Sequence, residues 1–454
     1  MRIESINPAT EEINATFETD SDEKVIQICK NSRFAFSSWK IIPVFERAHY
    51  LNQLANILRQ NKNKYAKLIT IEMGKPIKQS IAEIEKSAMT ADYYANHVEQ
   101  WLADEFIQTE AKKSFVTHEP LGVILSIMPW NFPFWQLIRC AVPALAVGNV
   151  SILRHSNNVP MCAKAIEEAF QLAGFPDGVF RTIITEHDII KKITRRNLID
   201  GVSLTGSVAA GQTIGKLAGQ HIKKSVLELG GSDPFIVLSD ADLDVATDGA
   251  VEGRNVNSGQ SCVSSKRFIV VKKIADEFIN RFVTKMKKLR VGDPLDENTS
   301  TGPMANKHQL ELLDTQVKKS VAQGATIMTG GKKIFEKGYF YEPTVITRIK
   351  KHMPVFKEEV FGPVAPVFIV NNEKQALKIA NDSKLGLGAT LWSKDLDKAE
   401  KLSREIESGM VFVNGIVKSD PRLPFGGVKE SGIGRELSRY GLLEFVNTKS
   451  IVIN

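Results

Sequence analysis

One cysteine of this chain stands where a reactive thiol is expected. Cys262 lies in the stretch NSGQSCVSS (257–265), whose small polar residues cannot build an apolar wall around it. Cys140 in RCAVPAL and Cys162 in VPMCAKAI lie instead among apolar residues, which is typical of buried structural cysteines. The pattern favours an accessible thiol at Cys262. The alternative is that a small residue simply closes a tight turn there.

Two further stretches supply the partners that a nucleophilic thiol needs, a proton acceptor and a donor to a developing oxyanion. Glu228 in SVLELGGSDP follows an apolar run that should raise its pKa and suit it to general-base work on water. Asn131 in MPWNFPFW is framed by Pro129 and Pro133, so its amide is held for donation. Alone, Glu228 could be a strand-end acid and Asn131 a turn residue.

A third stretch suits a phosphate. LTGSVAAG (204–211) ends an apolar strand and opens a helix, so backbone N–H groups near Gly206 and Ser207 can meet a pyrophosphate. The region has no GxGxxG pattern, and an ordinary strand-to-helix turn is the alternative.

The elements that must position these residues alternate along the chain. Helical periodicity covers about 22–100 and strand patterns cover 105–129. Residues 149–206 then read strand (149–154), helix (159–174), strand (178–184), helix (188–197), strand (201–206), which predicts a parallel sheet with right-handed crossovers. A second alternating series follows Gly230. The last strand, FVNTKSIVIN, should pair with the strands at 104–120 or with another subunit.

Composition narrows the class of protein. The chain has 454 residues, 43% hydrophobic and 24% charged, which suits a globular enzyme of two or three domains. Its net charge of +7 is spread among acids, which argues against nucleic-acid binding. No signal-peptide pattern or apolar run of membrane length occurs, and no cysteine or histidine pair has zinc spacing. We therefore expect a cytoplasmic protein without membrane anchor or metal.

Taken together, PWNFP, LELGG, GQSC and EEVFGP, in that order, resemble the aldehyde dehydrogenase superfamily, and the resemblance runs from INPAT to PFGGVKESGIGRE. It implies that Cys262 is the nucleophile, Glu228 the general base, and the Asn131 side chain with the Cys262 N–H the oxyanion hole. It further implies that the thiolate adds to an aldehyde, that hydride passes to a nicotinamide, and that water activated by Glu228 cleaves the thioester.

The resemblance also implies a domain plan and a cofactor site. We predict an α/β fold with two Rossmann-like, doubly wound domains: a dinucleotide-binding domain (1–103 and 121–229) and a catalytic domain (230–435), with oligomerisation strands at 104–120 and 436–454. Glu359 and Phe361 in EEVFGP should lie by the nicotinamide ribose and ring. The expected cofactor-binding residues are Met128, Pro129, Trp130, Arg154, Ser156, Asn157, Thr205, Gly206, Ser207, Leu229, Glu359 and Phe361.

One strand end bears on the cofactor. ILRHSNN (152–158) departs from the common family form, Lys-Pro-x-Glu. A Glu at the place of Asn157 would bind a ribose 2′-OH and repel a 2′-phosphate, whereas Asn removes that repulsion and Arg154 keeps a cation. The sequence therefore favours NADP, with NAD as the alternative.

Two residues bear on the substrate. Arg139 and Ser419 match positions that hold the far carboxylate in succinate-semialdehyde dehydrogenases, and SDPRLPFGG is typical of that subgroup. The alternative is that Arg139 makes a structural salt bridge and Ser419 caps a turn. Val256 stands where some members have a second arginine, and Ser264 where some relatives have a second cysteine that forms a reversible disulfide.

The leading hypothesis is an NAD(P)-dependent oxidation of succinate semialdehyde by a homodimer or homotetramer. A broad aliphatic or other semialdehyde dehydrogenase is the nearest alternative. A thiol esterase and an inactive cofactor-binding protein are more distant ones, and the intact set of Cys262, Glu228 and Asn131 argues against the latter.

Overall fold

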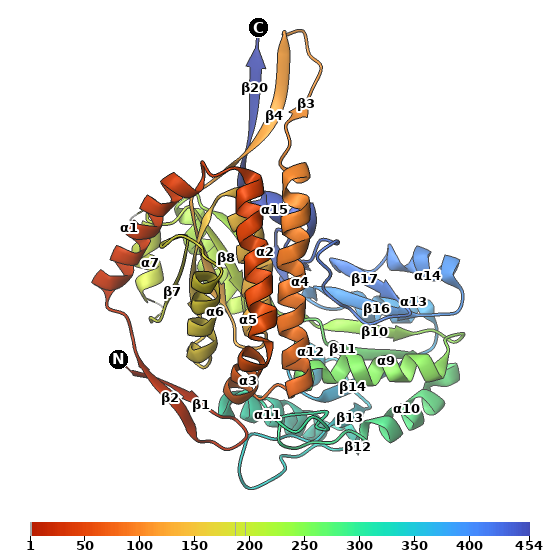
Figure 1. Ribbon diagram of the computed structural model, residues 1–454. Coiled ribbons are helices and arrows are strands. Elements are labelled where there is room, and N and C mark those ends of the chain that lie inside the picture. Colours follow the sequence, from red (N-terminus) through yellow and green to blue (C-terminus); the bar gives the residue numbers. More distant parts are fainter. Residues whose placement is uncertain (1, 187, 196) are drawn as a thin grey trace.

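The computed structural model describes residues 2–186, 188–195 and 197–454. Two α/β bodies lie side by side, and a long narrow sheet projects from them (Figure 1). The residues outside this description are 1, 187 and 196. All three belong to the predicted cofactor domain, and residue 196 also belongs to the helix predicted over 188–197.

The N-terminal part is helical, as the periodicity predicts. A two-stranded sheet of β1 (Arg2–Ile6) and β2 (Ile13–Glu18) precedes it. The four helices that follow are α1 (Asp22–Trp39), α2 (Val44–Gln60), α3 (Lys62–Met73) and α4 (Ile77–Trp101). Ser21 caps α1 by accepting a hydrogen bond from the Lys24 N–H, and Gly74 ends α3 at a φ of 80°. The helix α4 stands between the two bodies (Figure 1).

The first large sheet has the strand order of a dinucleotide-binding fold. From one edge it runs β7-β6-β5-β8-β9, all parallel, and the short β19 joins β9 antiparallel. Its strands are β5 (Val123–Met128), β6 (Val150–His155), β7 (Phe180–Ile183), β8 (Gly201–Thr205), β9 (Lys224–Glu228) and β19 (Gly432–Ile433). The strand order reverses between β5 and β8, and ligands of such sheets bind beyond the carboxyl ends at that point.

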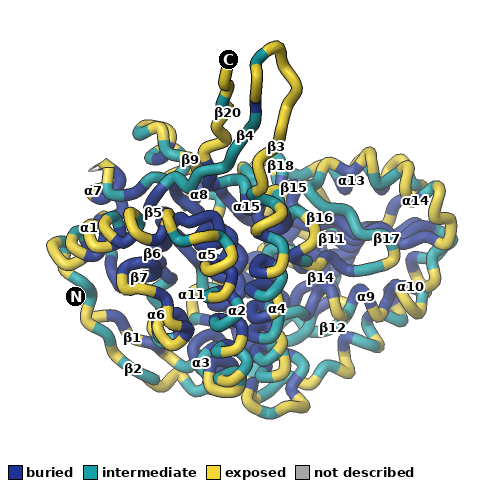
Figure 2. The backbone as a smooth tube through the Cα atoms, turned by 45° about the horizontal axis from the view of Figure 1, so that its top comes forward, coloured by how far each residue is buried: buried dark blue, intermediate teal, exposed yellow. Residues whose placement is uncertain are grey.

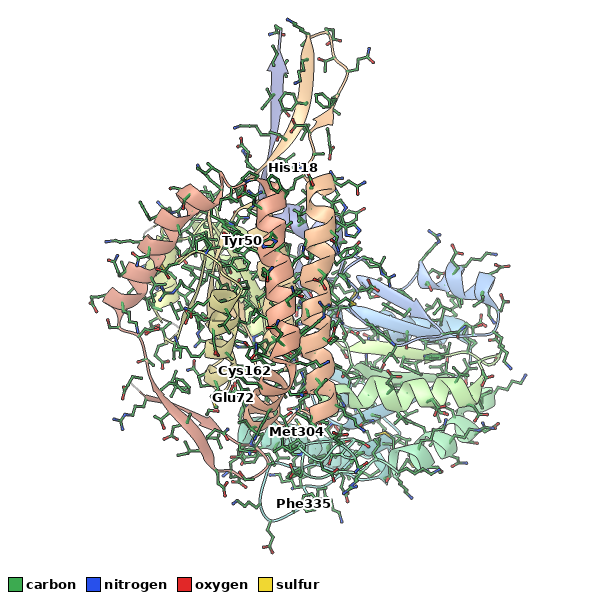
Figure 3. All side chains as sticks on the ribbon, viewed as in Figure 1. Tyr50, Glu72, His118, Cys162, Met304 and Phe335 are labelled. Carbon is green, nitrogen blue, oxygen red and sulfur yellow. The ribbon has the colours of Figure 1, made fainter. Side chains whose placement is uncertain are left out.

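Helices cover this sheet on both faces. They are α5 (Pro133–Val147), α6 (Pro160–Leu172), α7 (Asp188–Arg195) and α8 (Val208–Gln220). Every residue of α5 is buried, because α5 packs against both the sheet and α4. The N-terminus of α6 is capped by Glu72, which accepts hydrogen bonds from the N–H groups of Met161 (2.9 Å) and Cys162 (2.8 Å). Figure 3 shows Glu72 and Cys162 side by side, and Cys162 is buried, as its apolar surroundings in the sequence predict.

The second large sheet follows the order β12-β13-β14-β11-β10-β16-β17, parallel except for the β12–β13 pair. Its strands are β10 (Asp233–Val237), β11 (Ser265–Val271), β12 (Thr326–Thr329), β13 (Thr344–Thr347), β14 (Val364–Val370), β16 (Gly388–Trp392) and β17 (Met410–Val413). Its helices are α9 (Leu243–Asn255), α10 (Lys272–Met286), α11 (Lys307–Ala322), α12 (Pro354–Lys357), α13 (Glu373–Asn381) and α14 (Leu396–Ser403). The rings of Phe235, Phe268 and Trp392 pack together inside it. The predicted α/β fold with two Rossmann-like sheets is confirmed.

The terminal strand pairs within the chain. β20 (Val446–Ile453) lies antiparallel to β4 (Lys113–Pro120), and β3 (Glu105–Phe106) covers the other edge of β4. Figure 2 shows this sheet projecting from the buried interior, with His118 of Figure 3 near its base. Short elements complete the fold: β15 (Leu385–Gly386), β18 (Val428–Lys429), α15 (Ser438–Leu442) and single turns at 256–259 and 443–445.

Within the described residues, no helix is long and apolar enough to cross a membrane. The same part of the chain holds no group of three or more His, Cys, Asp or Glu side chains arranged to hold a metal ion.

Candidate active site

The turn that carries Cys262 is held in an uncommon backbone conformation. Asn257, Ser258 and Gly259 all have positive φ (52°, 55° and 77°). A Cβ on Gly259 would lie 2.2 Å from the Gly362 carbonyl oxygen, so only glycine fits there. Such strain persists only where surrounding contacts over-determine it. Here the Ser258 hydroxyl donates to the Gly302 carbonyl (3.1 Å) and accepts from the Gly302 N–H (2.9 Å).

Asn131 is tied to the same turn. Its Nδ2 donates to the Gln260 carbonyl (3.1 Å), and its Oδ1 accepts from Gln136 Nε2 (3.0 Å). Asn257 Nδ2 donates in turn to the Asn131 carbonyl (2.8 Å). Because an amide nitrogen carries two N–H groups, one remains for an oxyanion. The Cys262 N–H has no acceptor within the described part of the chain, so both predicted oxyanion donors are available.

Cys262 is the only one of the four cysteines that is partly exposed; all four lie within the described residues. Burial raises the pKa of its thiol to about 11, while the positive charges of Arg139 and Lys266 act to lower it. The Lys266 ammonium donates to the Cys262 carbonyl (2.6 Å) and pairs with Glu359 at 3.1 Å. A lysine therefore connects the cysteine turn to one of the predicted cofactor residues.

Glu228 is the last residue of β9, and its side chain is buried. It is 2% exposed, and neither carboxylate oxygen has a hydrogen-bond partner among the described residues. Burial raises its pKa well above the ordinary value, the neighbouring Glu436 raises it further, and Arg139 opposes both. An unpartnered carboxyl with a raised pKa is suited to take a proton from water. This is the environment expected of Glu228 from its apolar strand.

Two clefts meet at Cys262. One has a volume of about 390 Å³ and opens over the carboxyl ends of β5 and β8. Its lining includes ten residues predicted to act in catalysis or cofactor binding: Pro129, Trp130, Asn131, Thr205, Gly206, Ser207, Leu229, Cys262, Glu359 and Phe361. The other, of about 520 Å³, runs past α4 and α5 and includes Cys262, Arg139 and Ser419. A thiol at such a junction can contact ligands on both sides.

The first cleft fits a dinucleotide. Ser207 is the N-cap of α8, so free N–H groups and the positive end of that helix face the cleft beside Gly206. Trp130 and Phe361 meet edge to face at 5.8 Å between ring centres. Glu359 accepts a hydrogen bond from the Gly231 N–H at 3.2 Å. Met128, which is 1% exposed, does not line this cleft but ends β5 beneath it.

The other three predicted cofactor residues lie at the end of β6. Arg154 donates to Asn157 Oδ1 (2.9 Å) and to the Thr185 carbonyl (3.2 Å). The Ser156 N–H donates to the Met128 carbonyl, which ties the ends of β5 and β6 together. A guanidinium beside a neutral amide presents no carboxylate to a 2′-phosphate. This arrangement fits NADP.

Arg139 lines the second cleft, but its guanidinium is already paired with a carboxylate of the protein. Its guanidinium forms a buried ion pair with Glu436, and the two residues are 2% and 4% exposed. It also donates to Thr205 Oγ1 (3.3 Å) and packs 4.5 Å from the centre of the Phe425 ring. The geometry therefore matches the alternative of a structural salt bridge, and the role of Arg139 in binding substrate stays a prediction.

Sequence reasoning missed several residues of the site. Lys86 and Gln136 line the second cleft, Glu83 anchors the N–H groups of Phe134 and Trp135, and Lys266 supports the cysteine turn. Lys86 and Glu83 lie on a helix with no motif around them, whereas Gln136 and Lys266 directly follow the MPWNFPFW and NSGQSCVSS stretches. Their roles come from contacts across more than one element.

The chain is similar to known proteins over its whole length. The family model "Aldehyde dehydrogenase family" matches residues 1–451. A probable succinate-semialdehyde dehydrogenase [NADP(+)] from Synechocystis sp. is 46% identical over 453 residues, which cover 100% of both chains. A succinate-semialdehyde dehydrogenase [NADP(+)] from Mycobacterium tuberculosis is 44% identical over 456 residues, again 100% of both. A crystal structure of succinic semialdehyde dehydrogenase from Streptococcus pyogenes with NADP+ superposes with a TM-score of 0.97 at 36% identity, covering 99% of each chain.

Proposed function

Because the chain belongs to the aldehyde dehydrogenase family, we propose that it oxidises succinate semialdehyde to succinate with NADP as the hydride acceptor. The observation that carries this proposal is the position of Cys262, which lines both the cleft that fits a dinucleotide and the cleft that fits an aldehyde. The names of its relatives from Synechocystis sp. and Mycobacterium tuberculosis support the same substrate and cofactor.

Cys262 is the nucleophile of the proposed reaction. The thiol releases its proton to solvent, and the resulting thiolate adds to the aldehyde carbon, so that the carbonyl oxygen becomes an oxyanion. The free N–H of Asn131 Nδ2 and the backbone N–H of Cys262 donate to that oxygen, because the strained turn at 257–259 holds the two donors together. NADP held in the first cleft would accept the hydride of the adduct, and Cys262 would keep the acyl group as a thioester.

Glu228 is the general base of the second half of the proposed reaction, the hydrolysis of the thioester. It takes a proton from water, and the hydroxide attacks the thioester, releasing the carboxylate and the Cys262 thiol. Because burial raises the pKa of Glu228, this step should speed up as the pH rises through that pKa. The positive charge of Arg139, which also pairs with Glu436, opposes that shift.

The first sheet is the proposed cofactor-binding domain. We assign residues 1–103 and 121–229 to it and 230–435 to the catalytic domain, because the reversal of strand order between β5 and β8 lies in the first part and Cys262 in the second. The N-terminus of α8 would hold the pyrophosphate, Trp130, Glu359 and Phe361 the nicotinamide end, and Arg154 with Asn157 the 2′-phosphate.

The projecting sheet is the proposed contact between subunits of a homodimer or homotetramer. The outer edge of β20 has no strand beside it within the described residues, and Val452 and Ile453 are 58% and 47% exposed. An open strand edge of eight residues that is apolar at its end is a ready surface for another chain. Light scattering of the purified protein, compared with a chain shortened before Ile451, tests this assignment.

Initial rates of nicotinamide reduction test the whole proposal. We expect faster turnover of succinate semialdehyde than of butanal, and of NADP than of NAD. Cys262→Ala should abolish all four activities. Equal rates with butanal and succinate semialdehyde would refute the proposed substrate, while the proposed aldehyde oxidation by Cys262 would still stand. Reduction that survives in Cys262→Ala would refute the mechanism.

A further inference from the structure

The first two turns of α4 contact both segments that carry the predicted oxyanion donors. Gln79 and Glu83 are four residues apart on α4, so they lie on the same face of the helix. Gln79 bonds to the turn that leads to Cys262, and Glu83 bonds to the helix that follows Asn131. Because α4 stands between the two bodies (Figure 1), one helix touches the surroundings of both donors.

Glu83 takes the place of an N-cap side chain at α5. The N-cap residue of α5, Phe132, makes no side-chain capping hydrogen bond. Instead, Glu83 Oε1 accepts hydrogen bonds from the N–H groups of Phe134 (3.0 Å) and Trp135 (3.1 Å), which a helix leaves without acceptors of its own. Asn131 immediately precedes Phe132, so a fixed start of α5 also fixes the backbone from which the Asn131 amide extends.

A buried lysine holds Glu83 in this place. Lys75 comes from the connector between α3 and α4, and its ammonium forms an ion pair with Glu83, the two side chains being 0% and 1% exposed. The ammonium also lies 3.7 Å from the centre of the Phe132 ring. A buried ion pair often adds little net stability, so the main effect of this one is to fix the start of α5.

Gln79 holds the cysteine turn (257–262). Its Oε1 accepts a hydrogen bond from the Asn257 N–H at 2.7 Å, and Asn257 is the first of the three residues with positive φ in that turn. A Cβ on Gly302 would lie 2.1 Å from the Gly74 carbonyl oxygen, so the connector before α4 packs directly on the residue that bonds to Ser258. The strained turn is therefore held from the side of α4 as well.

We propose that Gln79 and Glu83 are positioning residues that together fix the distance between the two oxyanion donors, the Asn131 amide and the Cys262 N–H. Gln79 acts through the cysteine turn, and Glu83 acts through the start of α5. The oxyanion is fully stabilised only when both donors reach it, so a small shift of either donor slows the reaction. The inference rests on the proposed function, because it requires the attack of Cys262 on a carbonyl.

The test compares two rates for each variant. The first is NADPH formation in the first turnover, at saturation with whichever aldehyde the wild type oxidises faster. The second is alkylation of Cys262 by iodoacetamide in the free enzyme, in which the thiolate displaces iodide and no oxyanion forms. We expect Gln79→Met, and separately Lys75→Met/Glu83→Met, to slow the first turnover by about 10- to 100-fold, because a displacement of about 1 Å can cost that much. Alkylation should stay within about threefold of the wild-type rate, because it needs the thiolate but no oxyanion donor.

Matched variants separate the hydrogen bonds from the charges. Lys75→Met/Glu83→Gln also removes the ion pair but keeps an acceptor for the N–H groups of α5, so it should regain most of the first-turnover rate. Gln79→Glu keeps the acceptor for the cysteine turn and should likewise stay close to the wild type. Glu85→Gln changes a partly exposed ion pair on the same helix and should slow the first turnover less than about threefold, because such pairs contribute little.

A further comparison tests whether Glu83 acts through Asn131. Asn131→Ala should itself slow the first turnover by about 10²–10³-fold, since it removes one oxyanion donor. Adding Lys75→Met/Glu83→Met to Asn131→Ala should then cost less than about threefold more. Additive losses would show that Glu83 acts elsewhere and would overturn its positioning role.

The outcomes distinguish this inference from the proposed function. A Cys262→Ala protein that still reduces NADP would overturn the proposed function and the positioning roles with it. If reduction depends on Cys262 but is unchanged in Gln79→Met and Lys75→Met/Glu83→Met, the positioning roles alone are wrong. The same holds if alkylation falls in step with turnover, or if the variants change only KM. If the buried double variant does not fold, Gln79→Met decides by itself, because Gln79 is only partly buried.

Discussion

Replacing Arg139 by methionine should destabilise the protein, because it leaves Glu436 buried without its counter-charge. Both partners are almost fully buried, at 2% and 4% exposure, and Glu228 adds a second carboxyl to the same interior. Removing one partner of a buried ion pair costs about 3–5 kcal/mol, most of it the penalty of the charge left behind. A Met side chain fills much of the Arg volume, so the cavity contribution is small.

The loss should depend on pH in a definite direction. Burial raises the pKa of Glu436, and Arg139 opposes that rise, so the pKa increases further when Arg139 is removed. A carboxyl whose pKa is higher in the folded than in the unfolded state binds an extra proton on folding, and stability then falls as pH rises from about 4.3 through the folded-state pKa. Arg139→Met should therefore be least stable in alkaline solution and recover as the pH falls.

Thermal unfolding between about pH 5.5 and 8.5 measures this dependence. The matched control is Arg139→Met/Glu436→Gln, which carries no lone charge and should recover most of the lost stability at pH 8. The single variant Glu436→Gln leaves Arg139 alone and should be destabilised as well. An Arg139→Met protein as stable as the wild type at pH 8, or a double variant no better than Arg139→Met, would show that the ion pair is not structural.

Three further predictions concern catalysis. Glu228→Gln should retain a burst of one NADPH per active site and slow the following steady state by about 10²–10⁴-fold, because only thioester hydrolysis needs the base; a proportional loss of burst and steady state would contradict this role. Alkylation of Cys262 by iodoacetamide in the free enzyme should speed up roughly tenfold per pH unit up to about 11, since burial raises its pKa there; a plateau near neutral pH would show an activated thiolate instead. Asn157→Glu should lower kcat/KM for NADP relative to NAD by about 10- to 100-fold, by repelling the 2′-phosphate and occupying Arg154; Asn157→Gln is the neutral control, and an unchanged cofactor ratio would place the 2′-phosphate elsewhere.

Local sequence was sufficient for the fold class and for the three residues proposed for catalysis. Hydrophobic periodicity reports how each element buries one face, so the alternation around 149–206 already required a parallel sheet. The small residues next to Cys262 and the apolar residues before Glu228 are themselves part of the environment of these two side chains. The sequence therefore predicts that environment directly. These signals lie within a few residues of the groups they describe.

Tertiary structure alone decided which partner each buried cation of the second cleft meets. Arg139 and Lys86 lie 53 positions apart in sequence (139 minus 86), and nothing near either one reveals its partner. The fold brings Glu436 to Arg139 and Ser419 to Lys86 through elements more than 290 residues away along the chain. The partner of a buried charge comes from a segment that is distant in sequence and close only in the folded protein. Local sequence therefore does not show which residue neutralises it. For that reason the setting of Cys262 could be predicted from the sequence, while the ion pair of Arg139 with Glu436 could not.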